Sequence, residues 1–497
     1  MSEKTRYVVI GGGIAGVTAA ETLSVITENA TITLFSASPL IKTVSNLIQL
    51  TQTLETFDVE EQSFTGLKEL NNPVQVIHTT VTSLCAKDKQ LFTADGKVIE
   101  YDKLCICTGG KPKLISQDNP FVIGIRDTES VQTFQQRVKS ANRIIIVGNG
   151  GIATELVHEL EGCEVIWAIK DKSIAHTFVD PGAGEFFMEY VNKVKDNTQE
   201  GVSKRLKYTT EETNRKSPVQ SNVMGSALGP DWATRLQIHG PQEVSHRVHI
   251  EHQVEVQKMI SPEQFQQLSM TQTVLDGSVV ESSTWPVYVQ LTNGKVYGCD
   301  LVVSATGVEP FTDLFLPGND FDVAADGGLK VNSKMETSEP HVYAAGDVCT
   351  ACWEYSPLWL QMRLWTQARQ MGCYAAKCMV AAAKGEEISM DFCFELFAHA
   401  TTFFKFKAIN FFLLLVILLG RFNGQGLQND YEVLLRVTKG KEYVKAILQN
   451  GRLVGAILIG ETDLEETFEN LILNGMDLTP FKENLLEPGI DVDDFFD

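Results

Sequence analysis

Two glycine-rich loops, each directly after a run of apolar residues, constrain this chain more than any other feature. The first lies within residues 6–16 (Arg-Tyr-Val-Val-Ile-Gly-Gly-Gly-Ile-Ala-Gly), where Gly11, Gly13 and Gly16 have the G-x-G-x-x-G spacing. In a Rossmann-like βαβ unit, the first glycine permits a tight turn, the second admits a pyrophosphate to the backbone, and the third lets the helix pack on the strand. We therefore expect a strand at 6–10 and a helix from near Ile14 whose N–H groups face the phosphates.

The second loop repeats this pattern within residues 143–155, with Gly148, Gly150 and Ala153 in register. A single motif of this kind is weak evidence, because glycines cluster in turns by chance. Two copies in one chain predict two bound dinucleotides. That arrangement suits the transfer of a hydride from a nicotinamide to a flavin.

A second repeated phrase, Thr-Gly-x-x-Pro, ends one apolar strand at residues 101–112 and another at 298–310. A strand that ends in Thr-Gly can bring the backbone close to a cofactor, and the proline prevents a helix from following. Residues 327–347 end in Ala-Ala-Gly-Asp, which we interpret as a short buried strand with Asp347 beside ribityl hydroxyls. A helix from about 357 to 383 would then direct its positive end at the flavin ring.

These patterns predict an α/β protein with two nested Rossmann-like dinucleotide-binding domains and a C-terminal α+β domain. The expected FAD-binding domain is discontinuous, at 1–120 and 300–388, and the NAD(P)H-binding domain lies between them at 121–299. The second domain contains a polar insertion at about 192–245, too poor in apolar residues to order itself alone. The C-terminal domain covers 389–497, with strand-like segments at 392–397, 431–437, 443–448 and 453–459 and a final helix from 464.

Composition excludes several functional classes. The net charge of -21 and the isoelectric point near 4.9 argue against nucleic-acid binding. The nine apolar residues at 411–419 are too few to span a bilayer, so we expect no membrane association. No targeting leader is visible at the N-terminus, and the ten cysteines are scattered, which indicates free thiols in the cytosol or nucleus. No metal site is predicted.

In order and spacing, these motifs resemble the class I pyridine nucleotide-disulphide oxidoreductases over about residues 5–385. Further stretches carry the resemblance: Gly148-Asn-Gly-Gly-Ile-Ala, Cys163-Glu-Val-Ile-Trp-Ala-Ile-Lys-Asp-Lys, Gly225-Ser-Ala-Leu-Gly-Pro-Asp-Trp, Gln361-Met-Arg-Leu-Trp-Thr-Gln-Ala-Arg-Gln-Met-Gly and Gly460-Glu-Thr-Asp-Leu-Glu-Glu-Thr-Phe-Glu-Asn-Leu-Ile-Leu-Asn. The resemblance implies an FAD-dependent oxidoreductase that uses NADH or NADPH, acts in the oxidative-stress response of the cytoplasm and nucleus, and supports the sarcomere in muscle. Residues 408–417 depart from the family pattern, and we interpret them as a gene-model insertion or an alternative transcript.

The motifs place two sets of residues at the cofactors. The set expected at FAD is Gly11, Gly13, Ile14, Ala15, Gly16, Ser36, Lys42, Val81, Thr108, Gly109, Gly346, Asp347 and Val348. The set expected at the nicotinamide nucleotide is Gly148, Asn149, Gly150, Gly151, Ile152, Glu155, Lys170, Thr306 and Gly307. Ser36 stands where the dinucleotide fingerprint has an acid for the ribose, so we expect a weaker hydroxyl contact there.

Two of these residues are candidates for catalysis. Lys42, expected in a loop that passes the flavin ring, would stabilise reduced flavin by its charge, although a loop lysine is most often simply solvated. Glu155 would lie near the nicotinamide, or would be only an acid that the helix dipole favours near a helix start. Lys170 and Lys172 follow the second strand of the nicotinamide domain and would accept a 2′-phosphate, so we expect use of both NADH and NADPH.

The cysteine pattern does not support the disulphide chemistry of the family. Residues 41–45 (Ile-Lys-Thr-Val-Ser) occupy the place of the reactive pair, and Cys163 stands alone in the nicotinamide domain. The C-terminal His-Glu pair is also missing, since His399 has no suitable neighbour in the sequence. Cys349-x-x-Cys352 is the one candidate, because a thiol at a helix N-terminus has a lowered pKa, but packing is the commoner role.

Three functions remain open from the sequence. The first is an NAD(P)H oxidoreductase whose acceptor is oxygen or an unknown compound. The second is a redox-gated protein whose reduced flavin and nicotinamide complex docks or protects a client protein. The third is a disulphide reductase acting through Cys349 and Cys352. The missing acceptor-side cysteines favour slow chemistry with a protein client.

Overall fold

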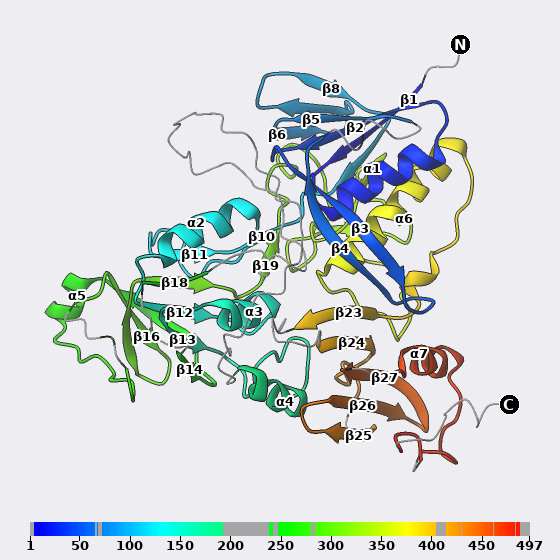
Figure 1. Ribbon diagram of the computed structural model, residues 1–497. Coiled ribbons are helices and arrows are strands. Elements are labelled where there is room, and N and C mark those ends of the chain that lie inside the picture. Colours follow the sequence, from blue (N-terminus) through cyan, green and yellow to red (C-terminus); the bar gives the residue numbers. More distant parts are fainter. Residues whose placement is uncertain are drawn as a thin grey trace, which may run out of the picture.

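The computed structural model describes residues 4–64, 67, 72–191, 238–241, 247–278, 280, 284–403, 414–428, 430–460, 462–482 and 484–487. Three five-stranded sheets organise these residues (Figure 1). Most of the predicted polar insertion at about 192–245 lies outside the described residues. The same holds for 404–413, which includes the start of the apolar run.

The first sheet is parallel, in the order β21-β9-β1-β2-β5. Its strands are β1 (Thr5–Ile10), β2 (Ala30–Ser36), β5 (Val74–His78), β9 (Lys103–Ile106) and β21 (Val342–Ala344). The apolar run of β1 is buried from Tyr7 to Ile10, as expected for a parallel strand covered on both faces. Helices α1 (Ile14–Ile26) and α6 (Trp365–Lys384) lie side by side, and they approach so closely that a Cβ at Gly372 would overlap the carbonyl oxygen of Ala15 (Figure 1).

The second sheet repeats the parallel pattern, in the order β11-β18-β12-β13-β14. Its strands are β11 (Val122–Gly124), β12 (Arg143–Val147), β13 (Glu164–Ala168), β14 (Arg247–Glu251) and β18 (Leu301–Ser304). Its helices are α2 (Thr128–Val138), α3 (Gly151–Glu159) and α4 (Pro181–Val191). The Ile-rich strand β12 is buried along its whole length. The glycine loops therefore leave two equivalent sheets at their carboxyl edges.

Smaller elements surround these two sheets. They are the hairpin β3 (Ile41–Gln49) and β4 (Glu55–Gln62); the strands β6 (Val81–Cys85), β7 (Gln90–Thr93) and β8 (Val98–Glu100); the strands β15 (Val256–Ile260), β16 (Val287–Leu291) and β17 (Val296–Cys299), with helix α5 (Pro262–Gln267); the pair β20 (Leu329–Val331) and β22 (Cys349–Ala351); and the ribbon β10 (Gly110–Pro112) and β19 (Val308–Pro310). The ribbon connects the two parallel sheets (Figure 1).

The third sheet is antiparallel and belongs to the C-terminal part of the chain, in the order β23-β24-β27-β26-β25. Its elements are β23 (Ala398–Phe403), β24 (Leu414–Gly420), β25 (Glu432–Thr438), β26 (Glu442–Gln449), β27 (Arg452–Ile459) and helix α7 (Glu465–Asn474). The strand expected at 392–397 is wrong, because a 3-10 turn at Phe392–Phe394, capped by Asp391, comes first. Among the described residues, no helix combines the length and apolar character needed to cross a membrane.

Candidate functional site

The first glycine loop connects β1 to α1 at the carboxyl edge of the first sheet. Gly11 has φ +125°, a conformation that favours glycine, and a Cβ there would overlap the carbonyl oxygen of Cys107. A Cβ at Gly16 would overlap the carbonyl oxygen of Gly11. Gly13 differs, because it is the extended N-cap of α1 and, apart from its chain neighbours, no described residue has an atom within 4 Å of a Cβ at this position. The loop is therefore closed on its protein side and open at the N-terminus of α1.

The other residues predicted at FAD lie on several elements of this unit. Ile14 and Ala15 begin α1, Val81 begins β6, Thr108 and Gly109 follow β9, and Gly346, Asp347 and Val348 follow β21. Ser36 ends β2 and is buried, and its hydroxyl donates to the carbonyl oxygen of Ser38 at 2.8 Å. The hydroxyl hydrogen of Ser36 is thus already used within the protein, which leaves its oxygen as an acceptor.

The two Thr-Gly-x-x-Pro phrases pair with each other in the ribbon β10–β19. The Thr108 hydroxyl donates to the carbonyl oxygen of Phe311 at 2.8 Å. By the same geometry, the Thr306 hydroxyl donates to the carbonyl oxygen of Lys113 at 2.8 Å. Each threonine therefore ties its own strand to the residue that follows the other phrase. The repeat has a structural reason that the sequence does not reveal.

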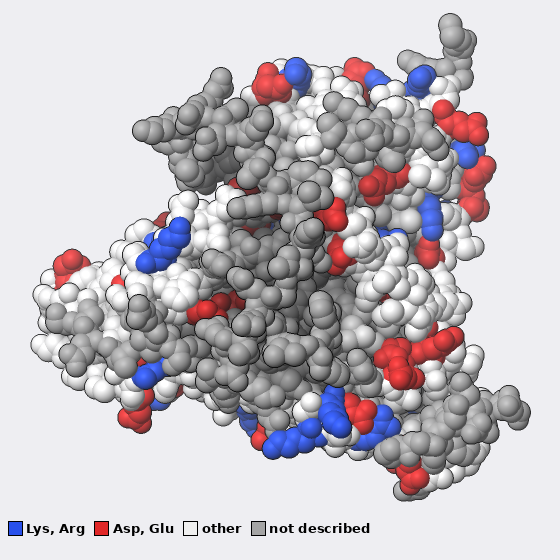
Figure 2. All heavy atoms as spheres, in the orientation of Figure 1, with Lys and Arg blue, Asp and Glu red and all other residues white. Residues whose placement is uncertain are grey.

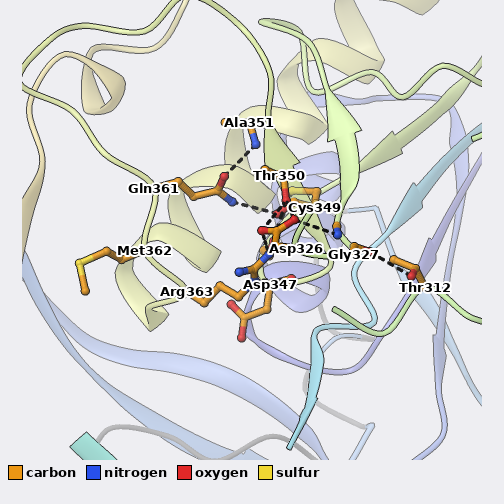
Figure 3. Close-up of polar contacts among 12 residues, drawn as sticks. Thr312, Asp326, Gly327, Asp347, Cys349, Thr350, Ala351, Gln361, Met362 and Arg363 are labelled. Carbon is orange, nitrogen blue, oxygen red and sulfur yellow. Dashed lines mark hydrogen bonds and ion pairs between the residues drawn. The ribbon is translucent and has the colours of Figure 1, made fainter. Parts of the chain in front are cut away.

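A pocket at the N-terminus of α6 is lined by Gly346, Asp347, Gln361, Met362, Arg363, Gln367, Ala368 and Met371. Arg363 donates from Nε to the Asp347 carbonyl oxygen at 2.9 Å, and its Nη2 lies 2.7 Å from Oδ2 of Asp326 (Figure 3). The Asp347 carboxylate points away from this network and accepts no hydrogen bond within the described part of the chain (Figure 3). Burial raises the pKa of Asp347, and the positive charges of Arg363 and Arg126 partly oppose this increase. This carboxylate is available to a ligand hydroxyl.

Helix α6 begins at Trp365, so the prediction of a start near 357 is wrong. Side-chain hydrogen bonds hold the preceding segment in another conformation. The Gln361 amide donates to the carbonyl oxygen of Cys349 at 2.9 Å and accepts from the Ala351 N–H at 2.7 Å (Figure 3). The Met362 N–H donates to the Gln367 side chain at 2.7 Å. The segment thus lines the pocket and does not extend the helix.

Lys42 lies in strand β3 and is buried, so the expected loop position is wrong, and so is the alternative that it is simply solvated. Its Nζ is 2.6 Å from Oε1 of Glu61 on β4. The backbone N–H of Lys42 donates to the carbonyl oxygen of Gly12, inside the first glycine loop, at 2.9 Å. The structure therefore joins Lys42 directly to the loop, while its flavin contact stays a prediction.

Arg126 is a candidate functional residue that the sequence reasoning missed. It directly precedes the Asp127 N-cap of α2, and its Nη2 donates to the carbonyl oxygen of Thr108 at 3.2 Å. Burial lowers the pKa of Arg126, and the carboxylates of Asp127 and Asp347 oppose this. The sequence contains a signal for this residue, because the Asp-x-x-Ser capping box that follows predicts the start of a helix. A helix start fixes the backbone position of the arginine that precedes it. A cation beside Thr108 suits an anionic cofactor.

The second glycine loop has the same geometry as the first. Gly148 has φ +135°, and a Cβ there would overlap the carbonyl oxygen of Ala305 at the end of β18. Gly150 is the extended N-cap of α3, and in the described part of the chain only its own neighbours lie within 4 Å of the position of a Cβ. Gly151 and Ile152 form the first turn of α3, and Glu155 lies half-buried in the next turn. The predicted nucleotide residues thus gather around one open helix start.

The Asn149 side chain fastens this loop to the segment after β13. Its amide donates to Oδ2 of Asp171 at 2.9 Å and to the carbonyl oxygen of Ser173 at 2.8 Å, and it accepts from the Ala175 N–H at 2.7 Å. Lys170 and Lys172 flank Asp171, are exposed, and make no ion pair with any described residue. Two exposed lysines without an ion-pair partner among the described residues therefore flank the aspartate that fastens the loop.

The cysteine candidate differs from the sequence prediction. Cys349 lies in strand β22, fully buried, and its Sγ donates to the carbonyl oxygen of Gly346 at 3.3 Å. Burial raises the pKa of this thiol. Cys105 raises the pKa further, whereas the positive charge of Arg363 lowers it. The expected pKa lowering at a helix N-terminus is wrong, because no helix begins there. Cys352 is exposed.

His399 has a partner that its sequence neighbours do not supply. It is buried in β23, and its Nδ1 lies 3.1 Å from the Thr366 hydroxyl in the first turn of α6. Burial lowers the pKa of His399 to about 4, so the imidazole is neutral near pH 7. The contact joins the C-terminal sheet to the helix that faces the pocket.

Charges of both signs are spread over the visible face, on which the described residues form no broad basic patch (Figure 2). The described residues also contain no group of three His, Cys, Asp or Glu side chains placed to hold a metal ion. The ligand features are instead two open helix N-termini and one free carboxylate. These fit two dinucleotides, since helix N-termini bind pyrophosphates and Asp347 can accept from hydroxyl groups.

Comparison with known families gives two matches. The model described as "Pyridine nucleotide-disulphide oxidoreductase" matches residues 5–224 and 241–372. The model described as "Rubredoxin NAD+ reductase C-terminal domain" matches residues 419–476. Among curated relatives, pyridine nucleotide-disulfide oxidoreductase domain-containing protein 1 of Rattus norvegicus is 53% identical, covering 99% of this chain and 98% of its own. Its namesake in Drosophila melanogaster is 44% identical, covering 100% of both chains.

Solved structures show the same fold. An engineered water-forming NADPH oxidase bound to NADPH has a TM-score of 0.63 at 17% identity, over 95% of this chain and 92% of that one. A ferredoxin reductase for the CYP199A2 system from Rhodopseudomonas palustris has a TM-score of 0.60 at 16% identity, over 92% and 91%. The family resemblance and the α/β, Rossmann-like fold class are thereby confirmed.

Proposed function

The chain belongs to the pyridine nucleotide-disulphide oxidoreductase family, and we propose that it is an FAD-dependent NAD(P)H oxidoreductase that works without a reactive cysteine pair. Family and fold support an oxidoreductase that uses a flavin and a nicotinamide nucleotide. The observation that carries the finer proposal is the pair of open N-caps, Gly13 and Gly150, one on each parallel sheet. When bound, the two cofactors supply hydride transfer from nicotinamide to flavin.

The residues divide the binding work between the two sheets. The N-terminus of α1 would hold the FAD pyrophosphate, with Arg126 as a nearby cation, and Asp347 would accept from ribityl hydroxyls. The N-terminus of α6 would face the ring and favour negative charge there. The N-terminus of α3 would hold the nucleotide pyrophosphate, and Glu155 would orient the nicotinamide. Since burial raises the pKa of Cys349, that thiol stays protonated and is a poor nucleophile.

The test is an absorption spectrum of the purified protein before and after anaerobic addition of NADH or NADPH. We expect flavin bands that bleach on addition. Steady-state turnover with oxygen then separates a fast enzyme from a protein whose reduced form persists and binds a client. A well-folded protein that stays colourless after reconstitution with FAD contradicts the proposal.

A double substitution, Lys170→Glu and Lys172→Glu, is expected to raise the KM for NADPH at least tenfold while that for NADH changes less than twofold. The reason is that both lysines are exposed and lack ion-pair partners among the described residues, so a 2′-phosphate would be their main anion. Stopped-flow reduction of the flavin by each nucleotide measures the ratio. Glu466→Gln, an exposed change on α7, serves as the control. Equal effects on the two nucleotides would show that the lysines do not read the phosphate.

We further propose the cytoplasm and nucleus as the location, oxidative-stress response as the role, and a protein client. All ten cysteines lie in described residues and are free, which suits a reducing compartment. The family resemblance supports the role and the sarcomere association, and the missing acceptor-side cysteines support the protein client. Fractionation of the natural protein and capture of partners with and without NADH test these points.

A further inference from the structure

The hairpin β3–β4 connects two distant parts of the protein. It runs from the first glycine loop toward the C-terminal sheet (Figure 1), and nine extended residues span about 30 Å. Its two strands pair only with each other. Because an isolated two-stranded hairpin is marginally stable, contacts with other elements must hold it in position.

The tip of the hairpin is held by the C-terminal domain. Leu54 is fully buried in the same hydrophobic core cluster as Leu471 and Ile472 of α7. Glu469, 1% exposed on α7, accepts from the Gln52 N–H at 2.9 Å and from the Thr53 N–H at 2.6 Å, and also from the Thr53 hydroxyl. A buried carboxylate needs such donors, because an unpaired buried charge is costly. Glu469 therefore binds the hairpin tip at both of its oxygens.

The rest of the hairpin touches the elements of the flavin site. Just after the tip, Oε2 of Glu55 lies 2.6 Å from Nη1 of Arg369 on α6. At the base, the Lys42 N–H donates to the carbonyl oxygen of Gly12 at 2.9 Å. Glu61 bonds both the Lys42 ammonium and the hydroxyl of Thr128. Displacement of the tip would therefore change the contacts that the base of the hairpin makes with the glycine loop.

We propose that Glu469 is a positioning residue for the flavin site. By fixing the tip of the hairpin, the C-terminal domain holds Lys42 against the glycine loop, so the loop keeps the conformation that admits the cofactor. The inference rests on the proposed function, because it places flavin at that loop. It also gives the C-terminal domain a role in cofactor binding. The sequence does not suggest this role, because the domain lies far along the chain from the glycine motifs.

The test compares Glu469→Gln with Glu466→Gln, an exposed acid on the same helix without a hydrogen bond or ion pair to any described residue. In Glu469→Gln, an NH2 group replaces one of the two carboxylate oxygens, so that its N–H donors face a backbone N–H donor of the hairpin tip. We expect amide hydrogen exchange of 41–49 in the FAD-free protein to accelerate at least tenfold. The FAD dissociation constant should also rise at least tenfold, and the flavin reduction potential should shift. Glu466→Gln should change none of these quantities.

A milder variant, Thr53→Val, removes one hydroxyl donor to Glu469 and should move each quantity in the same direction by a smaller factor. It keeps the inference testable if Glu469→Gln fails to fold. If the variants lower the melting temperature but leave exchange at 41–49 and FAD affinity unchanged, Glu469 is only structural and the inference fails. If the wild-type protein binds no FAD, the proposed function fails, while the exchange measurement still decides whether Glu469 fixes the hairpin.

Discussion

Replacing Gly13 with valine is expected to give a folded protein whose affinity for FAD falls at least 100-fold. The Gly13 backbone is extended, with φ -79°, and a Cβ there would meet no atom of the described residues within 4 Å beyond its chain neighbours. Loss of a good N-cap residue costs about 1 kcal/mol, which a protein of this size tolerates. The valine methyl groups would occupy the space through which a pyrophosphate reaches the N–H groups of α1. FAD titration and the visible spectrum measure the effect, and circular dichroism checks the fold.

Gly11→Val is the matched contrast, because it lies in the same loop but on the closed side. With φ +125° and the Cys107 carbonyl oxygen in the place of a Cβ, this substitution should disrupt the packing of β1 on β9 and lower the yield of folded protein. If a folded Gly13→Val protein has the flavin content of the wild type, the flavin does not bind at the N-terminus of α1. The two variants thus separate a glycine needed for the fold from one needed for the ligand.

The sequence predicted best the features set by neighbouring residues. A run such as Ile-Ile-Ile-Val followed by Gly-Asn-Gly-Gly predicts both the strand β12 and the start of α3, because strand burial, turn and helix entry are encoded within a dozen positions. The fold class followed from the repetition of such local units. The expected binding residues that follow β1, β9, β21, β12 and β18 lie at the carboxyl edges of the two sheets for the same reason.

Features that depend on distant partners could not be predicted in this way. Thr108 and Phe311 are 203 residues apart, so the bond that gives the Thr-Gly repeat its structural role has no local signature. Lys42 reads as a loop residue until its pairing with Glu61 places it in a hairpin. The sequence misplaces the start of α6 because the Gln367 side chain satisfies the Met362 N–H and the Leu360 carbonyl oxygen, two backbone groups that a longer helix would have used. Cys349 was assigned to a helix start by spacing alone.

Replacing Gly150 with valine is expected to abolish flavin reduction by NADH and NADPH, by at least 100-fold, without loss of FAD. Gly150 is the extended N-cap of α3, with φ -92°, and a Cβ there would have only its chain neighbours within 4 Å among the residues that the structure describes. The substitution leaves the first sheet, with its own glycine loop and Asp347, unchanged. Anaerobic stopped-flow with each nucleotide measures the loss. Dithionite, which needs no binding site, should still bleach the flavin as in the wild type.

Together, Gly13→Val and Gly150→Val test whether the two loops have different ligands. In the proposed arrangement, the first variant loses its colour, whereas the second stays yellow and cannot be reduced by nucleotide. A common effect of both variants on FAD would mean that the loops serve one ligand, and the reading of two dinucleotides would be wrong. Normal nucleotide reduction in Gly150→Val would mean that nucleotide binds elsewhere than at α3. Because neither Cβ would meet another described residue, these outcomes report on ligands and not on packing.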